Sequence, residues 1–200
     1  MERLNTISEF KGRTQFTSPV SGAVVRKKFC TRVVPSVLEA NAKGLDLEVE
    51  FKNDLPDSFY GDEGFIYELT SDILKASIAN TERGIVRISV SPDLFKETGE
   101  WWLTIMVDDS SPGIPPDQIN YIYGMNSELH TLSPERFPLV ENLRRLRDRC
   151  KMLGGDLIVA NMFADKYAVG GCCSGSLYLA SIPYRTISAA HSSFRKNYLA

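Results

Sequence analysis

Apolar side chains recur at helical spacing in three long stretches of this 200-residue chain. Apolar residues three and four positions apart line one face of a helix, so each stretch predicts an amphipathic helix. The predicted helices cover about residues 31–43, 62–78 and 139–153. Asp62 is a favourable N-cap for the second helix, and Lys43–Gly44 and Gly154–Gly155 are expected to end the first and the third.

Other stretches alternate apolar with polar residues or form short apolar runs, which predicts strands. The expected strands cover residues 45–51, 85–90, 101–107, 156–161 and 175–182. A polar loop over residues 92–100 joins the second and third of them into an antiparallel pair. A short helix around Ile119 and Ile122 follows, and residues 124–138 show no period and predict a mobile loop.

This order of elements predicts an α+β fold, a two-layer α/β sandwich with three main helices on one face of a mixed, mostly antiparallel sheet. Residues 29–184 then form one domain, residues 1–28 a leader or linker, and residues 185–200 a flexible tail. Trp101 and Trp102 are adjacent on a strand, so one of them faces the core and the other the opposite face of the sheet. That opposite face is a candidate contact surface if it is open, although burial at the sheet edge is the expectation.

Composition narrows the class of protein. The formal net charge of −2 provides no general attraction to nucleic acid or to an anionic membrane. No apolar run is long enough to span a bilayer, and the polar N-terminus lacks the core of a secretory signal. The four cysteines contain no C-x-x-C pair, which argues against a metal site and for reduced thiols in the cytoplasm. The basic character of residues 11–28 leaves an organellar transit peptide open.

Three segments stand out together. The predicted second helix carries Glu68, Asp72 and Ala76 at successive turns, and Val107-Asp-Asp-Ser-Ser-Pro-Gly113 directly follows a strand. The third segment is the last helix, which ends in Gly154–Gly155 and leads to the strand that stops at Pro183. Taken singly, these features are also what an ordinary turn before a helix and a solvated helix face provide. In this order, they resemble the ATP-binding catalytic domain of sensor histidine kinases, over residues 29–184.

The resemblance implies the histidine kinase-like ATPase fold, which gyrase-type ATPases, MutL and heat-shock chaperones share. In that family, a carboxylate in a D-x-G-x-G turn accepts a hydrogen bond from the adenine amino group. Asp109 matches this carboxylate, Gly113 matches the second glycine, and Ser111 replaces the first. Glycine lets the backbone approach the base closely, so we expect adenine contact to survive at some loss of fit.

The resemblance also implies a Mg²⁺ site, which is altered here. The family presents two asparagines four residues apart on one helix face, and Asp72 and Ala76 occupy these positions. Alanine has no oxygen to offer a metal, so Asp72 is the one candidate ligand. Glu68 matches the acidic position that activates water or substrate in related ATPases, which makes it the candidate catalytic residue.

The phosphate-binding segment departs from the family as well. The glycine run expected before the last helix is replaced by residues 137–142, which contain no glycine and carry Glu141. Leu143 on the same helix is expected at the nucleotide. The arginines of this helix either offset the charge of Glu141 or form a solvated or partner-docking face; they are Arg144, Arg145, Arg147 and Arg149.

The chain also lacks a convincing phosphoacceptor, because neither His130 nor His191 lies on a helix before a carboxylate. Its expected partners are therefore a dimerisation or phosphoacceptor domain, or a response-regulator-like protein. Three functions stay open, in order of preference. They are a degenerate kinase domain in a two-component phosphorelay that binds ATP weakly, an active ATP- and Mg²⁺-dependent kinase module, and an adaptor that binds no nucleotide.

Overall fold

The computed structural model describes residues 18–51, 58–95, 100–125, 137–163 and 173–186. The elements in chain order are β1 (Ser18–Ser21), α2 (Gly22–Ala42), β2 (Asp46–Phe51), β3 (Ser58–Gly61), α3 (Glu63–Asn80), β4 (Ile85–Phe95), β5 (Glu100–Asp109), α4 (Pro116–Tyr123), α5 (Pro138–Met152), β6 (Asp156–Phe163) and β7 (Cys173–Thr186). No helix in these ranges is long and apolar enough to cross a membrane.

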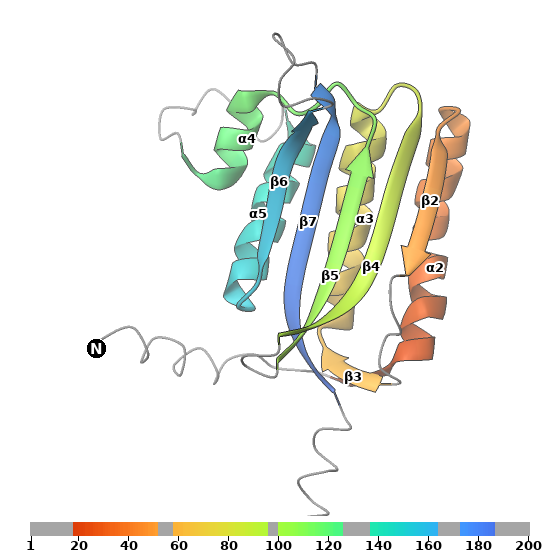
Figure 1. Cartoon of the computed structure of the whole chain (residues 1–200), viewed down its shortest axis with the longest axis vertical. Coiled ribbons are helices and arrows are strands. Elements are labelled where there is room, and N and C mark those ends of the chain that lie inside the picture. The colour runs from red at the N-terminus through yellow and green to blue at the C-terminus, as the bar shows by residue number, and fades with distance from the viewer. Residues whose placement is uncertain (1–17, 52–57, 96–99, 126–136, 164–172, 187–200) are drawn as a thin grey trace, which may run out of the picture.

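The strands form a mixed sheet whose main body has the order β2-β4-β5-β7-β6 (Figure 1). Only β2 and β4 run parallel in the described pairs, and α3 lies in the connection between them, as a parallel crossover requires. The other neighbours are antiparallel, and the short β1–β3 ribbon joins the end of β7. The predicted mixed, mostly antiparallel sheet is confirmed.

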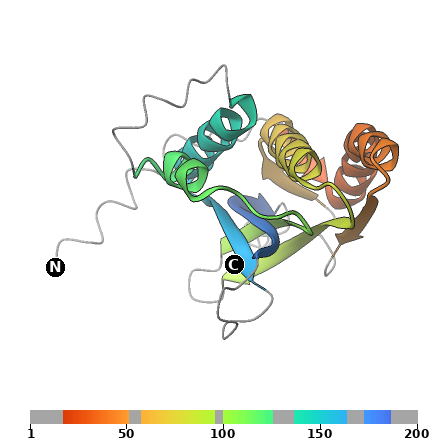
Figure 2. The ribbon, with the colours of Figure 1, turned by 90° about the horizontal axis from the view of Figure 1, so that it is seen from above.

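Three helices, α2, α3 and α5, cover one face of this sheet, and Figure 2 shows the other face without helices. Alternation in β5 directs Leu103, Ile105 and Val107 toward the helices, where each is at most 1% exposed. From the helix side, α3 contributes the largest buried stripe, which includes Phe65, Leu69, Ile73 and Ile78. The predicted two-layer sandwich is therefore confirmed.

Local signals set the helix ends as the sequence predicts. The side chain of Asp62 caps α3, since its Oδ1 accepts a hydrogen bond of 2.9 Å from the Phe65 amide. Helix α2 ends just before Gly44, which has a left-handed φ of 71°. Helix α5 ends just before Gly154, and the Gly155 amide donates to the Cys150 carbonyl.

The start of the fold differs from the prediction. Residues 1–28 are predicted to be a leader or linker, and the first helix to begin at about residue 31, whereas β1 begins at Ser18 and α2 at Gly22. The pair Ser21–Gly22 is a turn signal in the sequence, but it stands where the helix begins. Pro35 is correspondingly inside α2 and not in its first turn. Its missing N–H removes one helical hydrogen bond, while Phe29, Val33 and Ala40 on both sides of it are buried in the core.

Two strands are longer than predicted because pairing continues past a proline. Pro92 lies within β4, opposite Leu103, at a point beyond the residues of β4 that pair with β2. At Pro92, β4 has no neighbouring strand among the described residues on the β2 side, so no backbone N–H group is needed to pair with one and proline is tolerated. Strand β7 similarly continues through Pro183 to Thr186, two residues into the predicted tail, and Tyr184 is 4% exposed and packs against Trp101.

Candidate functional site

Asp109 ends β5 with its side chain on the helix side of the sheet, and the residue is 2% exposed. Its Oδ1 accepts hydrogen bonds from the Ser111 amide (3.0 Å) and the Ser176 amide (2.9 Å). Its Oδ2 accepts from the Ser77 hydroxyl at 2.7 Å. A carboxylate has about four acceptor positions, so one position on Oδ2 remains for a further donor.

Three separate parts of the fold supply these donors. Ser77 is on α3, Ser111 follows β5 directly, and Ser176 is near the start of β7, where it lies beside the end of β5. A close approach of the two strands makes the Ser176 contact possible. A Cβ atom on Gly175 would lie only 1.8 Å from the Asp109 carbonyl oxygen, so glycine is required there.

The turn after Asp109 is fixed by its own residues and by β6. The Ser111 hydroxyl accepts from the Gly113 amide at 3.2 Å and lies 2.9 Å from the Ser176 hydroxyl. Gly113 has a φ of 94°, a conformation that favours glycine. Asn161 brackets Ile114, donating to its carbonyl at 2.9 Å and accepting from its amide at 2.8 Å. The structure therefore brings Asp109, Ser111 and Gly113 together in one ordered turn.

Ala76 and Asp72 lie on α3 at the position before Ser77 and one turn earlier. Ala76 is 2% exposed and has no polar side-chain atom. The Asp72 carboxylate forms an ion pair of 3.3 Å with Lys75, three residues along the same helix. Within the described residues, no three His, Cys, Asp or Glu side chains gather as metal ligands. The predicted role of Asp72 as a Mg²⁺ ligand stays a prediction, with a lysine as its present partner.

Glu68 lies nine positions before Ser77 on α3, about 13 Å along the helix axis. Its carboxylate accepts from Arg149 of α5 at 2.6 Å, and the same guanidinium donates to Asp62 at 3.0 Å. Arg149 also lies over the Phe65 ring, 4.3 Å from its centroid. These contacts connect the start of α3 to the end of α5. The predicted catalytic carboxylate therefore has a cation as its partner and does not lie beside Asp109.

The predicted phosphate-binding segment forms the first turn of α5. Phe137 stands at the N-cap without a side-chain hydrogen bond, and Pro138 supplies no N–H group. The Glu141 carboxylate accepts from the Tyr121 hydroxyl of α4 at 2.6 Å, and this hydrogen bond raises the pKa of Tyr121. Leu143 is 3% exposed in the core beneath this turn.

Three of the four arginines on α5 contact aromatic rings and two of these form ion pairs. Arg144 lies 4.8 Å from the Tyr121 ring centroid and Arg147 lies 4.3 Å from that of Tyr123. Arg147 is 8% exposed and pairs with Asp156 at 3.1 Å, while Arg149 joins the carboxylates described above. These three side chains hold α4, α5 and α3 together, which differs from the free basic face that the sequence left open.

Burial raises the pKa of one group beside Asp109 and of one group on α5. Burial, followed by the charge of Asp109, raises the pKa of Tyr178, which lies two residues after Ser176. Burial also raises the pKa of the Cys150 thiol to about 12. The three donors to Asp109 are therefore neutral hydroxyl and amide groups, and the Tyr178 ring near them is neutral as well.

Sequence reasoning missed the residues that orient the turn, which are Ser77, Ser176 and Asn161. Ser77 directly follows Ala76, and Ser176 follows a glycine at a strand start, so both lie inside segments that the sequence singles out. Nothing local marks Asn161, which meets Ile114 across 47 positions of the chain.

No family model matches the sequence. Solved structures do resemble the fold. The catalytic domain of histidine kinase ThkA, in a nucleotide-free form, aligns over 83% of this chain and 95% of its own, with 15% identity and a TM-score of 0.58. Full-length ShkA in complex with AMPPNP aligns over 91% of this chain but 35% of its own, with 17% identity and a TM-score of 0.59. The mycobacterial sensor histidine kinase MprB aligns over 85% of this chain and 99% of its own, with 17% identity and a TM-score of 0.51.

These likenesses establish the fold. The chain has the histidine kinase-like ATPase fold that the sequence resemblance implies. At 15–17% identity they leave the chemistry to be argued from the side chains of this chain.

Proposed function

We propose that this chain is a degenerate histidine-kinase-type ATP-binding domain that holds an adenine nucleotide by its base and has lost Mg²⁺-dependent kinase chemistry. It acts in signal transduction through nucleotide or partner binding. The observation that carries the proposal is the Asp109 carboxylate, buried and held by three donors with one acceptor position left on Oδ2.

That carboxylate suits adenine in particular. Adenine carries an amino group where guanine carries a carbonyl oxygen, so a fixed carboxylate attracts the first base and repels the second. The three protein donors hold the carboxylate in place, which lowers the entropy lost on binding. Gly113 has no side chain to obstruct a flat ring beside the turn.

The metal and phosphate positions fit ATP less well. When bound with Mg²⁺, ATP would supply a transferable phosphoryl group. Of the two expected metal positions, Ala76 offers no oxygen and Asp72 is paired with Lys75. At the start of α5, Glu141 places a carboxylate where a triphosphate would need positive charge. Within the described residues, the chain therefore offers a held carboxylate for the base and, for the metal, Asp72 alone in an ion pair with Lys75.

The expected partners follow from this assignment. In the sequence, neither His130 nor His191 is directly followed by a carboxylate, and both lie outside the described residues. In this proposal, phosphotransfer uses a histidine from another domain or chain. A dimerisation or phosphoacceptor domain, or a response-regulator-like protein, is the proposed partner, and the cytoplasm is the proposed compartment.

A thermal-shift titration with ATP, ADP, adenosine and GTP, each with and without Mg²⁺, tests the proposal. Adenine ligands at about one hundred times the dissociation constant should add about 2.7 kcal/mol to the unfolding free energy. We expect the three adenine ligands to stabilise the protein without Mg²⁺, and GTP to have no effect.

Asp109→Asn is the informative variant, because it replaces one carboxylate oxygen with an NH₂ group, which donates and does not accept. Asp108→Asn is the matched control, since Asp108 is the preceding residue and bonds Arg87 instead. Nucleotide stabilisation should disappear in the first variant and persist in the second. No shift with any nucleotide would favour the adaptor, and a Mg²⁺-dependent shift with ATP hydrolysis would favour the active kinase.

A further inference from the structure

The face of the sheet opposite the helices carries two ordered rows of side chains. Cross-strand pairs point to the same face, so register defines each row. One row crosses the five strands from β6 to β2 through Ile158, Leu179, Met106, Ser89 and Glu50. The neighbouring row runs through Ala160, Leu177, Asp108, Arg87 and Glu48. We call these two rows the open face.

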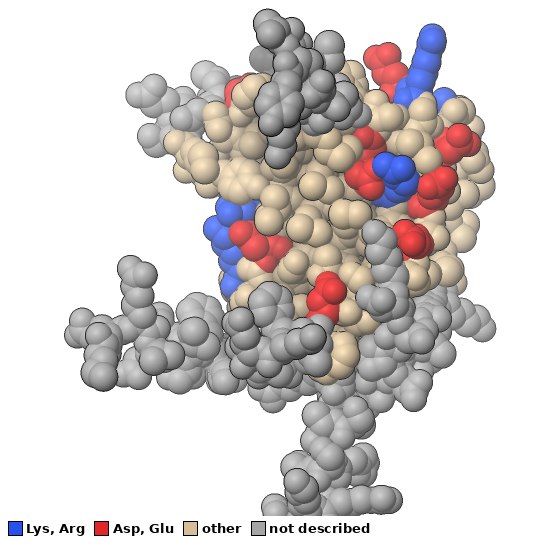
Figure 3. Space-filling view, viewed as in Figure 1, with Lys and Arg blue, Asp and Glu red and all other residues tan. Residues whose placement is uncertain are grey.

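The open face changes character from one side to the other. Over β6 and β7 both rows are apolar, and Ile158 is 43% exposed. Over β4 and β2 the rows carry charged and polar side chains, and Glu48 and Glu50 are exposed. In Figure 3 the centre of this face is uncharged and carboxylates gather toward the β2 side, while a separate group of charged side chains marks the opposite edge. An apolar region bordered by charge on the surface of a soluble domain indicates a binding surface.

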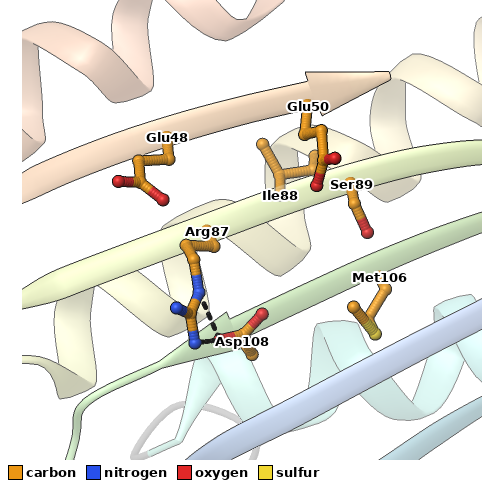
Figure 4. Close-up of a pocket in the computed structure, with 7 residues that line it drawn as sticks. All are labelled: Glu48, Glu50, Arg87, Ile88, Ser89, Met106 and Asp108. Atoms are coloured by element: carbon orange, nitrogen blue, oxygen red, sulfur yellow. Dashed lines mark hydrogen bonds and ion pairs between the residues drawn. The ribbon is translucent and has the colours of Figure 1, made fainter. Parts of the chain in front are cut away.

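The charged side of the open face is hollowed. A cavity of about 440 Å³ lies there, lined by Glu48, Glu50, Arg87, Ile88, Ser89, Met106 and Asp108 (Figure 4). Arg87 donates to Asp108 from Nε at 2.9 Å and from Nη2 at 2.6 Å. Three carboxylates meet one guanidinium in this lining, so the hollow has a net charge of −2.

We propose that the open face binds an amphipathic helix of a partner protein, with apolar residues over β6 and β7 and a lysine or arginine in the acidic hollow. Five strands about 4.8 Å apart span about 19 Å, the length of about 13 helical residues. A helix aligns apolar side chains at positions i, i+3, i+4 and i+7, which matches a row across strands. Charge complementarity assigns the basic end of that helix to the β2 side.

The same charges argue against a second copy of this chain. Two open faces packed against each other would place each acidic half against either another acidic half or an apolar half. Both arrangements are unfavourable, since like charges repel and carboxylates lose their water against apolar atoms. A partner with basic residues avoids both.

A fluorescent helical peptide of about 14 residues, with leucines along one face and lysines at one end, tests the proposal by fluorescence anisotropy. A matched peptide carries glutamates in place of the lysines. We expect the basic-ended peptide to bind about tenfold more tightly than the acidic-ended one, and to weaken with added salt. Equal affinity of the two peptides, or no binding by either, would overturn the proposal.

Two variants locate the surface. Leu179→Glu places a charge in the apolar half, and Glu48→Lys with Glu50→Lys reverses the charge of the hollow. Leu179→Glu should weaken the basic-ended peptide at least about tenfold, and the double variant should prefer the acidic-ended peptide instead. Peptide binding unchanged by Leu179→Glu would contradict the assignment, as would a dimer in sedimentation that Leu179→Glu dissociates.

The nucleotide proposal stands or fails separately. Both sets of variants lie on the face away from Asp109, so they should leave the adenine-dependent thermal shift unchanged. That shift also reports that the variants are folded. If the chain binds no nucleotide, circular dichroism and the melting temperature take over this control.

Discussion

The two ends of the expected nucleotide site are built differently. At the base end, Asp109 is 2% exposed and receives hydrogen bonds from α3, from its own turn and from β7. At the expected metal and phosphate end, Asp72 and Glu68 have partly exposed side chains on α3 and form ion pairs with Lys75 and Arg149. Removing a buried, hydrogen-bonded group lowers the unfolding free energy strongly, whereas an exposed ion pair contributes little to it.

Under the proposed function, this contrast gives a physical reason why the base end keeps its geometry while the metal and phosphate end has changed. The groups that orient Asp109 also hold β5, β7 and α3 together, so folding itself preserves the base end. Ala76 and Pro138 are accommodated within their helices without any contact to a metal or a phosphate being required by the packing. The fold therefore depends on the groups at the base end more than on those at the other end.

The largest effect is expected for Asp109→Ala, which removes the acceptor of three buried donors. The unfolding free energy should fall by about 4 kcal/mol, because each orphaned donor costs about 1–3 kcal/mol. Asp108→Ala, which removes a half-exposed ion pair with Arg87, should lower it by about 1 kcal/mol or less. Urea unfolding measures both, and equal losses would remove the contrast between the two faces of β5.

Gly175→Ala should lower the unfolding free energy by about 3 kcal/mol, since its Cβ would meet the Asp109 carbonyl oxygen at 1.8 Å and push β7 away. Gly124→Ala is the control. That glycine has a φ of 68° with open space around it, so strain of about 1 kcal/mol is expected there. Thermal unfolding compares the two, and a tolerated Gly175→Ala would mean that the strand approach is not needed.

Arg149→Met should lower the unfolding free energy by about 1 kcal/mol, because it releases Asp62 and Glu68 but retains an apolar chain over Phe65. Glu68→Gln should have about half that effect and should leave adenosine affinity unchanged. A double-mutant cycle followed by chemical denaturation measures the coupling. Loss of nucleotide binding in Glu68→Gln with stability intact would instead assign Glu68 to the ligand.

Asp72→Asn restores the residue that the kinase family carries at this position, and it should have the smallest effect. Its ion pair with Lys75 is on the helix surface, so the unfolding free energy should change by about 0.5 kcal/mol or less. Adenosine affinity should stay the same within about twofold, because Ala76 still offers no oxygen. Calorimetry with and without Mg²⁺ measures this, and the appearance of Mg²⁺-dependent binding would show that one residue suffices for a metal site.

Local chemistry made much of this fold predictable. Asp62 caps the start of α3, and Gly44 and Gly154 follow the last residues of α2 and α5, all through contacts within a few residues. The spacing of apolar residues, helical in some segments and alternating in others, indicates the two layers directly. Chain contacts over long separations were not predictable. Ser77 and Ser176 reach Asp109 across 32 and 67 positions of the chain. The antiparallel pairing that carries β7 past Pro183 joins Tyr184 to Trp101, which is also far away in the sequence.

The predicted site residues divide in the same way. Asp109, Ser111 and Gly113 are close in sequence, so one turn brings them together. Asp72, Ala76 and Leu143 depend on how α3 and α5 pack, and Glu68 acquires Arg149 as a partner from 81 positions away. The local sequence around a carboxylate does not show whether a distant residue pairs with it. An exposed carboxylate and a paired one therefore look the same in the sequence.

Calorimetric titration of adenosine, ATP and ATP with Mg²⁺ into the same preparation tests the central claim directly. If the base carries the binding, the three dissociation constants should agree within about threefold, which corresponds to less than 1 kcal/mol. Binding of ATP with Mg²⁺ more than about tenfold tighter than adenosine would contradict the account, because the phosphate and metal end would then contribute most of the selectivity.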